Sequence, residues 1–391
     1  MENRNNNVLY FLYKFIMSKT KKPRIVYIIN HASFFVSHRL ELFLSSKKLL
    51  DADPYLIIGK AGSEKMEKFA LRILKKKKIK YFQTSFVSSN NGLFFDFLAL
   101  FQIIKICKKI KPDIIHSASP KANFLAGLVS FVINLKLYVC SISGMGYLFT
   151  GKNLSFYEKI LKIIFETYLK ILKSKKNICF ILQNNFDYEL FKKKFGKKKS
   201  VLIPSSGINL KKFKFKKKKS NLIVMPSRIL YDKGVVDYLK AAIIIKKKYK
   251  NWIFKLIGAE DYNNPSAIPK RKLNEWKNKG LLDWESYTSK MEYIYQSASI
   301  VCLPSHREGF SKVILEAGAS SLPIVASNIP GCKQGIIDSK TGLLFKVKDH
   351  LDLAKKLEKL IKNKKLRNKL GKNANEFVKK NYDINKVNKE I

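Results

Sequence analysis

The chain has 391 residues, enough for two domains, and 46% of them are hydrophobic, which excludes a globally disordered protein. Its 77 Lys and Arg against 29 Asp and Glu give a formal net charge of +48, which points to an anionic membrane or a nucleic acid as partner. Only eight of these cations are Arg and the lysines are spread throughout, a pattern that also fits plain solvated surface and disfavours phosphate-reading nucleic-acid surfaces.

The five cysteines are scattered and lack CxxC spacing, so neither a disulfide framework nor a zinc site is predicted, as is typical of a reduced intracellular protein. No segment reaches the 18 or more apolar residues of a membrane span, and the runs Ala122–Leu135 and Gly92–Ile104 fit buried or interfacial helices. We interpret residues 1–23 as an N-terminal extension. Because Met17 is a plausible natural start, residues 1–16 are either outside the natural chain or a short membrane-touching helix.

In the first half, β-branched runs alternate with helical patterns. This alternation with short connections predicts a parallel, doubly wound sheet. The predicted strands are Arg24–Asn30, Pro54–Gly59, Ile79–Thr84, Pro112–His116, Leu137–Ser143 and Asn177–Gln183, and the predicted helices are Ser37–Leu50, Leu93–Ile110, Ala122–Ile133 and Ser155–Leu172.

The alternation restarts after Ser200–Pro204, a turn at Ser205–Gly207 and the lysine run Lys211–Lys219, which is the best linker candidate. We expect a first domain over 24–205, a second over 206–372 and a helical tail over 373–391, with two amphipathic helices from Leu351 onward. The predicted strands of the second half are Leu222–Pro226, Trp252–Gly258, Ile300–Pro304 and Ile324–Ser327, with helices at Val235–Tyr249 and within Glu308–Ser320.

The segment Pro304–Ala317 combines a strand end, a glycine turn and a helix start. The first N–H groups of such a helix are unpaired and carry partial positive charge, so they suit a diphosphate. Glu308 stands before the helix and Glu316 lies two turns into it, where one could reach a sugar and the other a ribose diol. The spacing of these two residues is explained equally well if Glu308 is only a charge at the helix terminus and Glu316 only a solvated side chain.

A second segment, Ser227–Gly234, follows the first strand of the second half. Arg228 and Lys233 lie five residues apart beside a glycine turn, so they could clamp a pyrophosphate and neutralise charge on a leaving group. The alternative is two ordinary surface cations. Arg is rare in this chain, however, and Arg228 ends a core strand, which favours the clamp.

Together these segments resemble the glycosyltransferases of family 4, which are retaining enzymes of the GT-B fold. The E-x7-E pattern is Glu308 to Glu316, and the S-R-x4-K-G pattern contains Arg228 and Lys233. The resemblance covers nearly the whole chain from Arg24, and motifs that recur in family order are highly specific. The further matching stretches are Gln183–Asp187, Val201–Gly207, Gly318–Gly331 and Thr341–Phe345.

The resemblance implies two Rossmann-like doubly wound α/β domains facing an interdomain cleft. It implies that Arg228 and Lys233 hold the donor diphosphate, that Glu308 binds donor-sugar hydroxyls and that Glu316 binds the nucleotide ribose. His116 matches the first-domain histidine beside the reacting sugar, although a buried, hydrogen-bonded histidine is the open alternative. The backbone expected to touch sugar and phosphate is that of Gly309, Phe310, Ser311, Lys312 and Val313.

The first half resembles bacterial surface-polysaccharide transferases, including the N,N'-diacetylbacillosaminyl-lipid galactosaminyltransferases, in Ser37–Arg39, His116–Lys121 and Ser143–Phe149. This implies a UDP-sugar donor, a polyprenyl-diphosphate-linked acceptor and a role in polysaccharide, lipopolysaccharide or capsule biosynthesis. The chain departs from the family at His31–Ser33, where a Gly-Gly loop is common, and at Gln334, where Glu is common. The residues expected on the acceptor side are His31, Ser33, His38, Lys121, Gly144 and Gly146.

We expect a metal-independent enzyme without a cofactor, because the cations and helix amides can do the electrostatic work of a metal. The DxD at Asp51–Asp53 precedes a strand instead of following one, which disfavours a metal role. We also expect peripheral attachment to the inner face of the plasma membrane through Tyr157–Lys175 and Lys75–Lys80, unless these lysines are simply wet surface. The rival functions are a UDP-sugar 2-epimerase of the same fold, which would need acid/base carboxylates, and a nucleic-acid-binding protein.

Overall fold

The computed structural model describes residues 22–61, 64–87, 93–146, 149, 155–213, 220–261, 264, 266–288 and 290–391. Residues 1–21 of the predicted N-terminal extension lie outside this described part of the chain. So do residues 214–219 of the predicted lysine linker, and Tyr147 and Leu148 of the Ser143–Phe149 motif.

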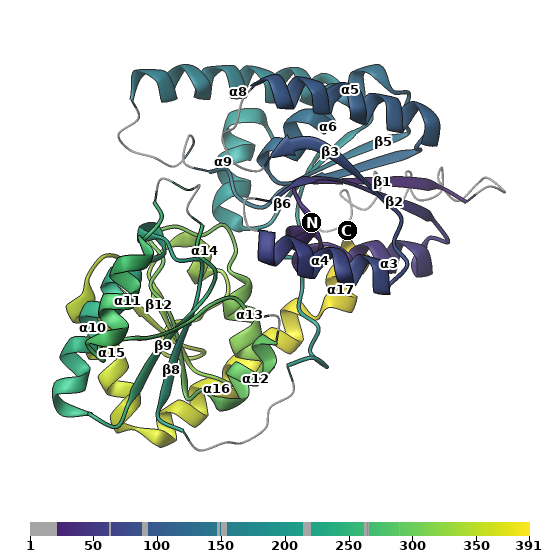
Figure 1. Ribbon diagram of the computed structural model, residues 1–391. Coiled ribbons are helices and arrows are strands. Elements are labelled where there is room, and N and C mark those ends of the chain that lie inside the picture. Colours follow the sequence, from purple (N-terminus) through teal and green to yellow (C-terminus); the bar gives the residue numbers. More distant parts are fainter. Residues whose placement is uncertain are drawn as a thin grey trace. The chain divides into compact units, whose positions relative to one another are not determined.

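The first sheet has seven strands in the order β3-β2-β1-β4-β5-β6-β7 (Figure 1). The pairs β1–β2, β1–β4, β2–β3 and β4–β5 are parallel, which confirms the doubly wound sheet predicted for this half. The strands are β1 Arg24–Ile29, β2 Asp53–Lys60, β3 Tyr81–Val87, β4 Ile114–Ala118, β5 Leu137–Ile142, β6 Ile178–Leu182 and β7 Ser200–Leu202.

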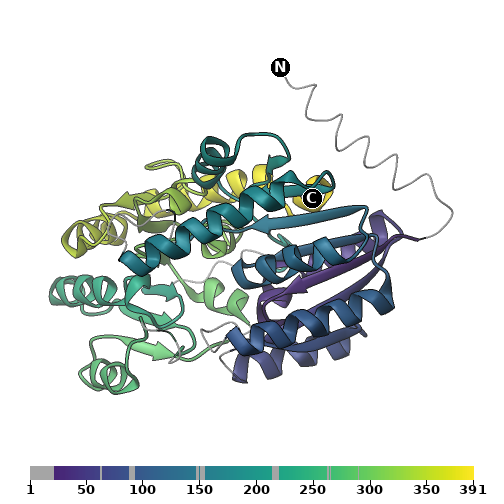
Figure 2. The ribbon, with the colours of Figure 1, turned by 90° about the horizontal axis from the view of Figure 1, so that it is seen from above.

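Helices cover both faces of this sheet, with α3 and α4 on one face and α5 and α6 on the other (Figure 1). The predicted helix Ser37–Leu50 is wrong in its bounds, because helix begins at Ala32 and breaks at Arg39, whose φ of −130° is not helical. Helices α4 and α9 were not predicted. The helices are α2 Ala32–His38, α3 Leu40–Leu49, α4 Glu64–Lys76, α5 Leu93–Ile110, α6 Pro120–Val132, α8 Phe156–Ser174, which is one long helix in Figure 2, and α9 Asn185–Phe195.

The second sheet has six parallel strands in the order β10-β9-β8-β11-β12-β13. Alternate side chains of its central strand β8 enter different cores, Ile223 and Met225 on one face and Val224 on the other. The strands are β8 Leu222–Pro226, β9 Ile253–Ile257, β10 Asp283–Glu285, β11 Ile300–Leu303, β12 Ile324–Ser327 and β13 Leu343–Phe345. The helices before the tail are α10 Val235–Lys248, α11 Lys270–Asn278, α12 Met291–Ser297, α13 Lys312–Ala319 and α14 Pro330–Lys333, with a 3₁₀ turn η1 at Tyr231–Lys233.

The C-terminal segment forms three helices instead of the two predicted: α15 His350–Lys362, α16 Lys364–Tyr382 and α17 Ile384–Glu390. Each is preceded by a polar residue whose side chain accepts hydrogen bonds from first-turn N–H groups: Asp349, Asn363 and Asp383. Because side-chain capping satisfies donors that would otherwise lack a partner, Asn363 can end α15 and start α16 without a loop.

By its internal contacts the chain divides into one compact unit of residues 1–61, 67–141 and 171–180, and a second of residues 62–66, 142–170 and 181–391. This division does not coincide with the domain boundary predicted between 205 and 206, which stays a prediction of the sequence. The predicted start of the tail at 373 falls inside α16. The five cysteines are unpaired, and four of them are buried.

Candidate active site

The two motifs of the second half lie side by side at the carboxyl ends of β8 and β11. Gly234, which follows η1, has φ of +73°, and a Cβ there would lie 2.0 Å from the carbonyl oxygen of Pro304. The backbone N–H of His306 donates to the carbonyl of Asp232 at 2.9 Å. Only glycine permits this approach, so the glycine turn of one motif is what brings it against the strand end of the other.

An ion pair joins the predicted diphosphate cation to the predicted sugar-binding carboxylate. Lys233 Nζ donates to Glu308 Oε1 at 2.8 Å, and both side chains are largely buried, with 17% and 15% of their surface exposed. Removing one member of such a pair leaves a desolvated charge. The predicted diphosphate contact of Lys233 and the predicted sugar contact of Glu308 involve these same two groups, so a ligand that makes both would share or replace this ion pair.

Arg228 reaches into the same edge of the sheet from the end of β8. Its Nη1 donates to Asp261 Oδ2 at 2.9 Å, and 53% of its side chain is exposed. An exposed pair of this kind is worth little, so the guanidinium can exchange its carboxylate for a phosphate at small cost. Sequence analysis did not identify Asp261, which lies in the segment after β9.

The amino end of α13 lies directly after the glycine turn. Ser311 precedes the helix in extended conformation and makes no side-chain cap, while Lys312 and Val313 begin the helix. Gly331 allows the close approach behind this turn, because a Cβ there would lie 2.3 Å from the Glu308 carbonyl and 2.5 Å from that of Gly309. An uncapped helix start of this kind is suited to an anion.

Glu316 is held by a side chain that the sequence did not single out. The fully buried Tyr295 of α12 donates its hydroxyl to Glu316 Oε2 at 3.0 Å. Burial raises the pKa of Glu316 above its usual value, although Lys312 and the Tyr295 hydroxyl counteract it. The carboxylate is therefore oriented before any ligand arrives.

In the first half, His116 lies within the core on β4. Its ring stacks on Tyr27 with centroids 5.3 Å apart, and its Nε2 lies 2.8 Å from Ser141 Oγ. Burial, with a smaller contribution from Arg39, lowers its pKa from 6.5 to about 3, so the ring is neutral at physiological pH. These contacts suit the alternative left open by the sequence, a buried hydrogen-bonded histidine. A role beside the sugar stays a prediction.

The loop after β1 is hydrogen-bonded within its own unit. His31 caps α2, because its Nδ1 accepts from the N–H of Phe34 at 3.2 Å, and the same Nδ1 lies 2.7 Å from Ser33 Oγ. Glu67 of α4 accepts from the N–H groups of Ala32 and Ser33 at 3.2 and 3.4 Å, and burial raises the pKa of this carboxyl. Glu67, which sequence analysis missed, thus satisfies two backbone N–H groups at the start of α2.

The remaining acceptor-side residues have separate surroundings. His38 stacks on Phe34 with ring centroids 4.5 Å apart, and Lys121 Nζ lies 3.0 Å from Asp96 Oδ2. Between Gly144 and Gly146, the N–H of Met145 donates to Asp187 at 3.1 Å, and burial raises the pKa of Asp187. Their predicted common role toward an acceptor stays a prediction.

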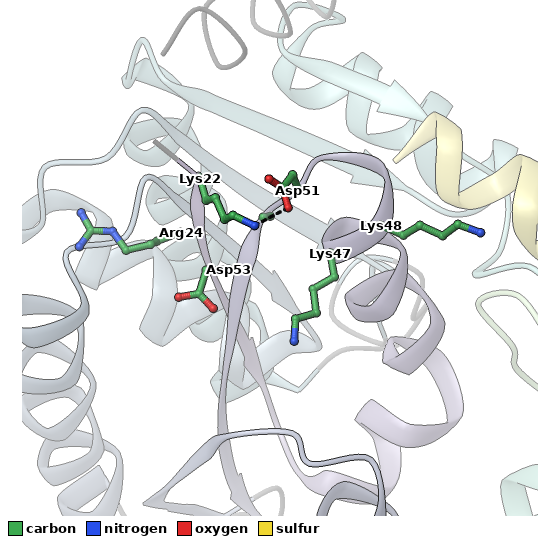
Figure 3. A pocket seen from close by; sticks show the side chains of 7 residues that line it. Lys22, Arg24, Lys47, Lys48, Asp51 and Asp53 are labelled. Atoms are coloured by element: carbon green, nitrogen blue, oxygen red, sulfur yellow. Dashed lines mark hydrogen bonds and ion pairs between the residues drawn. The ribbon is translucent and has the colours of Figure 1, made fainter. Parts of the chain in front are cut away.

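The DxD motif lies at the opposite edge of the first sheet, where β2 begins. Asp51 accepts from Lys22 Nζ at 2.7 Å, and Asp53 accepts from the Tyr55 hydroxyl at 2.6 Å. The two aspartates line a surface hollow of about 680 Å³ together with Lys22, Arg24, Lys47 and Lys48 (Figure 3). Cations surround these carboxylates, which suits a charge-balanced surface and not a metal centre.

Known proteins resemble this chain along most of its length. Residues 208–377 match the family Glycosyl transferases group 1, and residues 24–175 match Glycosyl transferase 4-like. The N,N'-diacetylbacillosaminyl-diphospho-undecaprenol alpha-1,3-N-acetylgalactosaminyltransferase of Campylobacter jejuni is 30% identical over 292 residues, 70% of this chain and 74% of that protein. The UDP-Gal:alpha-D-GlcNAc-diphosphoundecaprenol alpha-1,3-galactosyltransferase of Escherichia coli is 25% identical over 312 residues, 75% of this chain and 78% of that protein.

A solved structure shares the fold. The crystal structure of Anabaena Alr3699/HepE in complex with UDP and glucose superposes with a TM-score of 0.73 at 15% identity, covering 94% of this chain and 98% of that one. Two doubly wound parallel sheets, the paired motifs at the ends of β8 and β11 and these matches agree with one another. The chain therefore belongs to the family 4 glycosyltransferases and is a glycosyltransferase of the GT-B fold.

Proposed function

We propose that this glycosyltransferase moves a hexose or N-acetylhexosamine from a UDP-sugar to a lipid-linked saccharide, with retention of configuration, in cell-surface polysaccharide, lipopolysaccharide or capsule biosynthesis. The names of the Campylobacter and Escherichia relatives, both transferases that act on diphospho-undecaprenol-linked sugars, support the acceptor class. The UDP-bound HepE structure supports the donor class.

The observation that carries the proposal is the ion pair between Lys233 and Glu308 at the uncapped start of α13. Charge grows on the β-phosphate as the bond to the sugar breaks, and Lys233, Arg228 and the helix amides stabilise it. Glu308, once it shares Lys233 with the phosphate, accepts hydrogen bonds from the sugar hydroxyls. Glu316, which lies one turn and not two into α13, binds the ribose diol.

The acceptor hydroxyl attacks on the face that the UDP leaves, and the departing phosphate takes the proton. This route needs no protein base. The same cations and amides supply the electrostatic work that a metal does in other transferases, so we expect EDTA to leave turnover unchanged.

We further propose peripheral attachment to an anionic membrane, at the inner face of the plasma membrane, where a lipid-linked acceptor would reside. Among the described residues, no helix is long and apolar enough to cross a bilayer. Helix α8 is more apolar at its surface than the sequence suggested, since Phe156, Ile163 and Ile164 are 81%, 64% and 56% exposed. Of the run Lys75–Lys80, Lys75, Lys78 and Lys80 line a separate basic hollow with Arg72 and Tyr81.

A donor panel tests the function, with UDP release measured in the presence and absence of a polyprenyl-diphosphate-linked saccharide. Acceptor-dependent UDP release and a product of retained configuration are expected. The rival 2-epimerase is not favoured, because the relatives above are named as transferases. An epimerised UDP-sugar formed without acceptor, or no UDP release with any donor, would reject the proposal.

A further inference from the structure

Helix α5 turns bulky apolar side chains away from the protein. Its inward side is Ala99, Ile103 and Cys107, one residue per turn and fully buried. Its outward side begins with an aromatic cluster in which Phe94 and Phe95 contact at 5.8 Å between ring centroids, and Phe97 and Phe101 at 4.7 Å. We call this cluster the α5 aromatic face; its members are Phe94, Phe95, Phe97, Leu98 and Phe101, which are 73%, 45%, 61%, 41% and 55% exposed.

This exposure is unusual in both size and composition. Scattered apolar residues are normal on a protein surface, but five adjacent large ones on two helical turns are not. Further along the same outward side the apolar residues give way to lysines, with Lys105 and Lys108 exposed at the spacing that continues from Phe101. An aromatic end followed by a cationic end is the pattern of a helix that lies at a lipid surface.

The α5 aromatic face lies at the edge of the first sheet where ligands bind in such folds. Helix α6 starts directly after β4, so its first turn marks the carboxyl edge of the strands. Lys121 in that turn pairs with Asp96 in the first turn of α5 at 3.0 Å, which fixes the aromatic end of α5 at the same edge. Doubly wound sheets bind ligands at this edge.

We propose that the α5 aromatic face inserts into the lipid bilayer surface and thereby presents the carboxyl edge of the first sheet to an acceptor embedded there. The inference rests on the proposed lipid-linked acceptor. It changes the expected mode of attachment, because rings in the acyl boundary hold by apolar burial and not by charge alone. The basic hollow at Lys75–Lys80 follows α4, on the opposite face of the sheet (Figure 1), and is not the docking surface.

The lysines give the face its preference among lipids. Lys105 and Lys108 are exposed and the protein has a net charge of +48, so anionic headgroups complement this end of α5. Negatively charged bilayers should therefore bind best, while the aromatic rings retain part of the binding when salt screens the charges.

Vesicle flotation with the full-length protein tests the proposal, using phosphatidylcholine vesicles with and without 30% or so of phosphatidylglycerol, about the anionic content that generates a strong surface potential. We expect wild-type protein to float with anionic vesicles and to stay partly bound at about 1 M salt, where the screening length falls to about 3 Å. The triple variant Phe94→Ser/Phe97→Ser/Phe101→Ser should lose on the order of a hundredfold in vesicle affinity, since three rings no longer leave water.

Two matched variants make the result specific. Leu351→Ser removes a similarly exposed apolar residue from α15, and Lys75→Glu/Lys78→Glu/Lys80→Glu reverses the charge of the basic hollow. Neither should change flotation more than about twofold at about 1 M salt, where charges are screened. Flotation of the triple variant like wild type would overturn the proposal, as would full release of wild type by salt. Unchanged flotation with a change from dimer to monomer on sizing would assign the face to a second copy instead.

The enzyme assay separates the two proposals. The triple variant should transfer sugar to a water-soluble, short-chain acceptor at the wild-type rate and lose rate only with acceptor in vesicles. Absence of transfer by wild type to any acceptor would reject the proposed function, while flotation would still decide the docking face.

Discussion

Arg228 and Lys233 each hold a carboxylate before any donor is present, but in different surroundings. Arg228 pairs with Asp261 in an exposed position, whereas Lys233 pairs with Glu308 in a nearly closed one. Solvent screens the Coulomb attraction strongly in the exposed pair of Arg228 and weakly in the buried pair of Lys233. Arg228 can therefore exchange its carboxylate partner at lower cost than Lys233 can.

Replacing the clamp should reduce turnover more than binding. We expect Arg228→Ala and Lys233→Ala each to lower kcat by about 10²–10³-fold, because both act on charge that grows in the transition state. The double variant should lose less than the product of the two, since both cations serve one phosphate. Steady-state kinetics with a UDP-sugar measures this, and Lys279→Ala, which removes an exposed cation paired with Glu275 of α11, is the matched control. Near-normal turnover of Arg228→Ala would show the clamp assignment to be wrong.

Glu316 and Tyr295 should act as one unit on donor binding. Glu316→Gln should chiefly raise the donor KM, because a ribose contact is made equally in the ground and transition states. Tyr295→Phe keeps the buried ring but removes the hydroxyl, and should raise the same KM by a smaller factor of about 3–10. Burial raises the pKa of Glu316, so as the pH is lowered this side chain takes up a proton at a higher pH than an ordinary carboxylate does. Donor affinity should begin to fall at that higher pH, and Glu316→Gln should abolish this pH dependence. A kcat effect at constant KM would contradict this assignment.

His116 offers a test that separates a structural from a reactive role. Its pKa is lowered from 6.5 to about 3, so the folded protein binds this proton less well than the unfolded chain. Stability is then fully present above pH 6.5 and falls as pH drops, by about 2 kcal/mol between pH 7.5 and 5 from this residue. His116→Gln, whose amide can still reach Ser141, should flatten that part of the urea-unfolding profile. A large loss of kcat with an intact fold would instead support the predicted role beside the sugar.

At the scale of elements, the connections between strands position the chemistry. The η1 turn ends at Gly234 in a left-handed conformation and in contact with the end of β11. Helix α13 begins after a second turn that Gly331 makes possible. Both catalytic motifs thus depend on glycine packing against backbone, which a side chain would disrupt.

Gly234→Ala should damage the site through the backbone. A Cβ would lie 2.0 Å from the Pro304 carbonyl and φ of +73° disfavours any L side chain, so the two motifs must separate. We expect a loss of thermal stability corresponding to a few kcal/mol and at least a tenfold loss of kcat. Gly280→Ala, at a positive φ but with no atom within 4 Å of the added methyl, is the control and should retain activity. Equal behaviour of the two variants would exclude the close approach as the cause.

At the scale of the whole molecule, both halves of the chain form a doubly wound parallel sheet, but the two sheets carry different polar groups. Arg39 and His116 are buried in the first unit, whereas the second sheet presents the ion pair of Lys233 and Glu308 at its edge. Family matches over 24–175 and 208–377 cover both. The exposed aromatic surface of α5 belongs to the first unit, so the proposed membrane contact and the proposed donor site are built on different sheets.

Residues 1–16 should be dispensable for the transfer reaction. Expression from Met17 removes a segment that precedes the first strand, so activity toward a short acceptor should change less than tenfold. Flotation of the truncated protein, measured beside it, reports any membrane contact of this segment. A tenfold or larger loss of transfer to the short acceptor would contradict the expectation.

The sequence by itself determined the alternation of strands and helices, because buried β-branched runs such as Leu222–Pro226 and the helical period of Leu93–Ile110 are local patterns. It also showed the S-R-x4-K-G and E-x7-E patterns in the order in which they occur in the family, with Arg228 and Lys233 in the first and Glu308 and Glu316 in the second. It missed α4, although Ala70 and Leu74 lie at helical spacing and are buried, and its helix over Ser37–Leu50 overlooked the break at Arg39.

Only the tertiary structure decided which groups meet. Lys233 and Glu308 are 75 residues apart in sequence, and Arg228 and Asp261 are 33 apart, so no local pattern could pair them. Tyr295 and Glu67 show no signal in the sequence, because each acts through a contact with a distant segment. Tyr295 of α12 contacts the carboxylate of Glu316, and Glu67 of α4 contacts the start of α2. The exposure of Phe94 and its neighbours also depends on tertiary structure. The apolar run fits a buried or an interfacial helix, and only the packing of Ala99, Ile103 and Cys107 in the core shows which side of α5 is exposed.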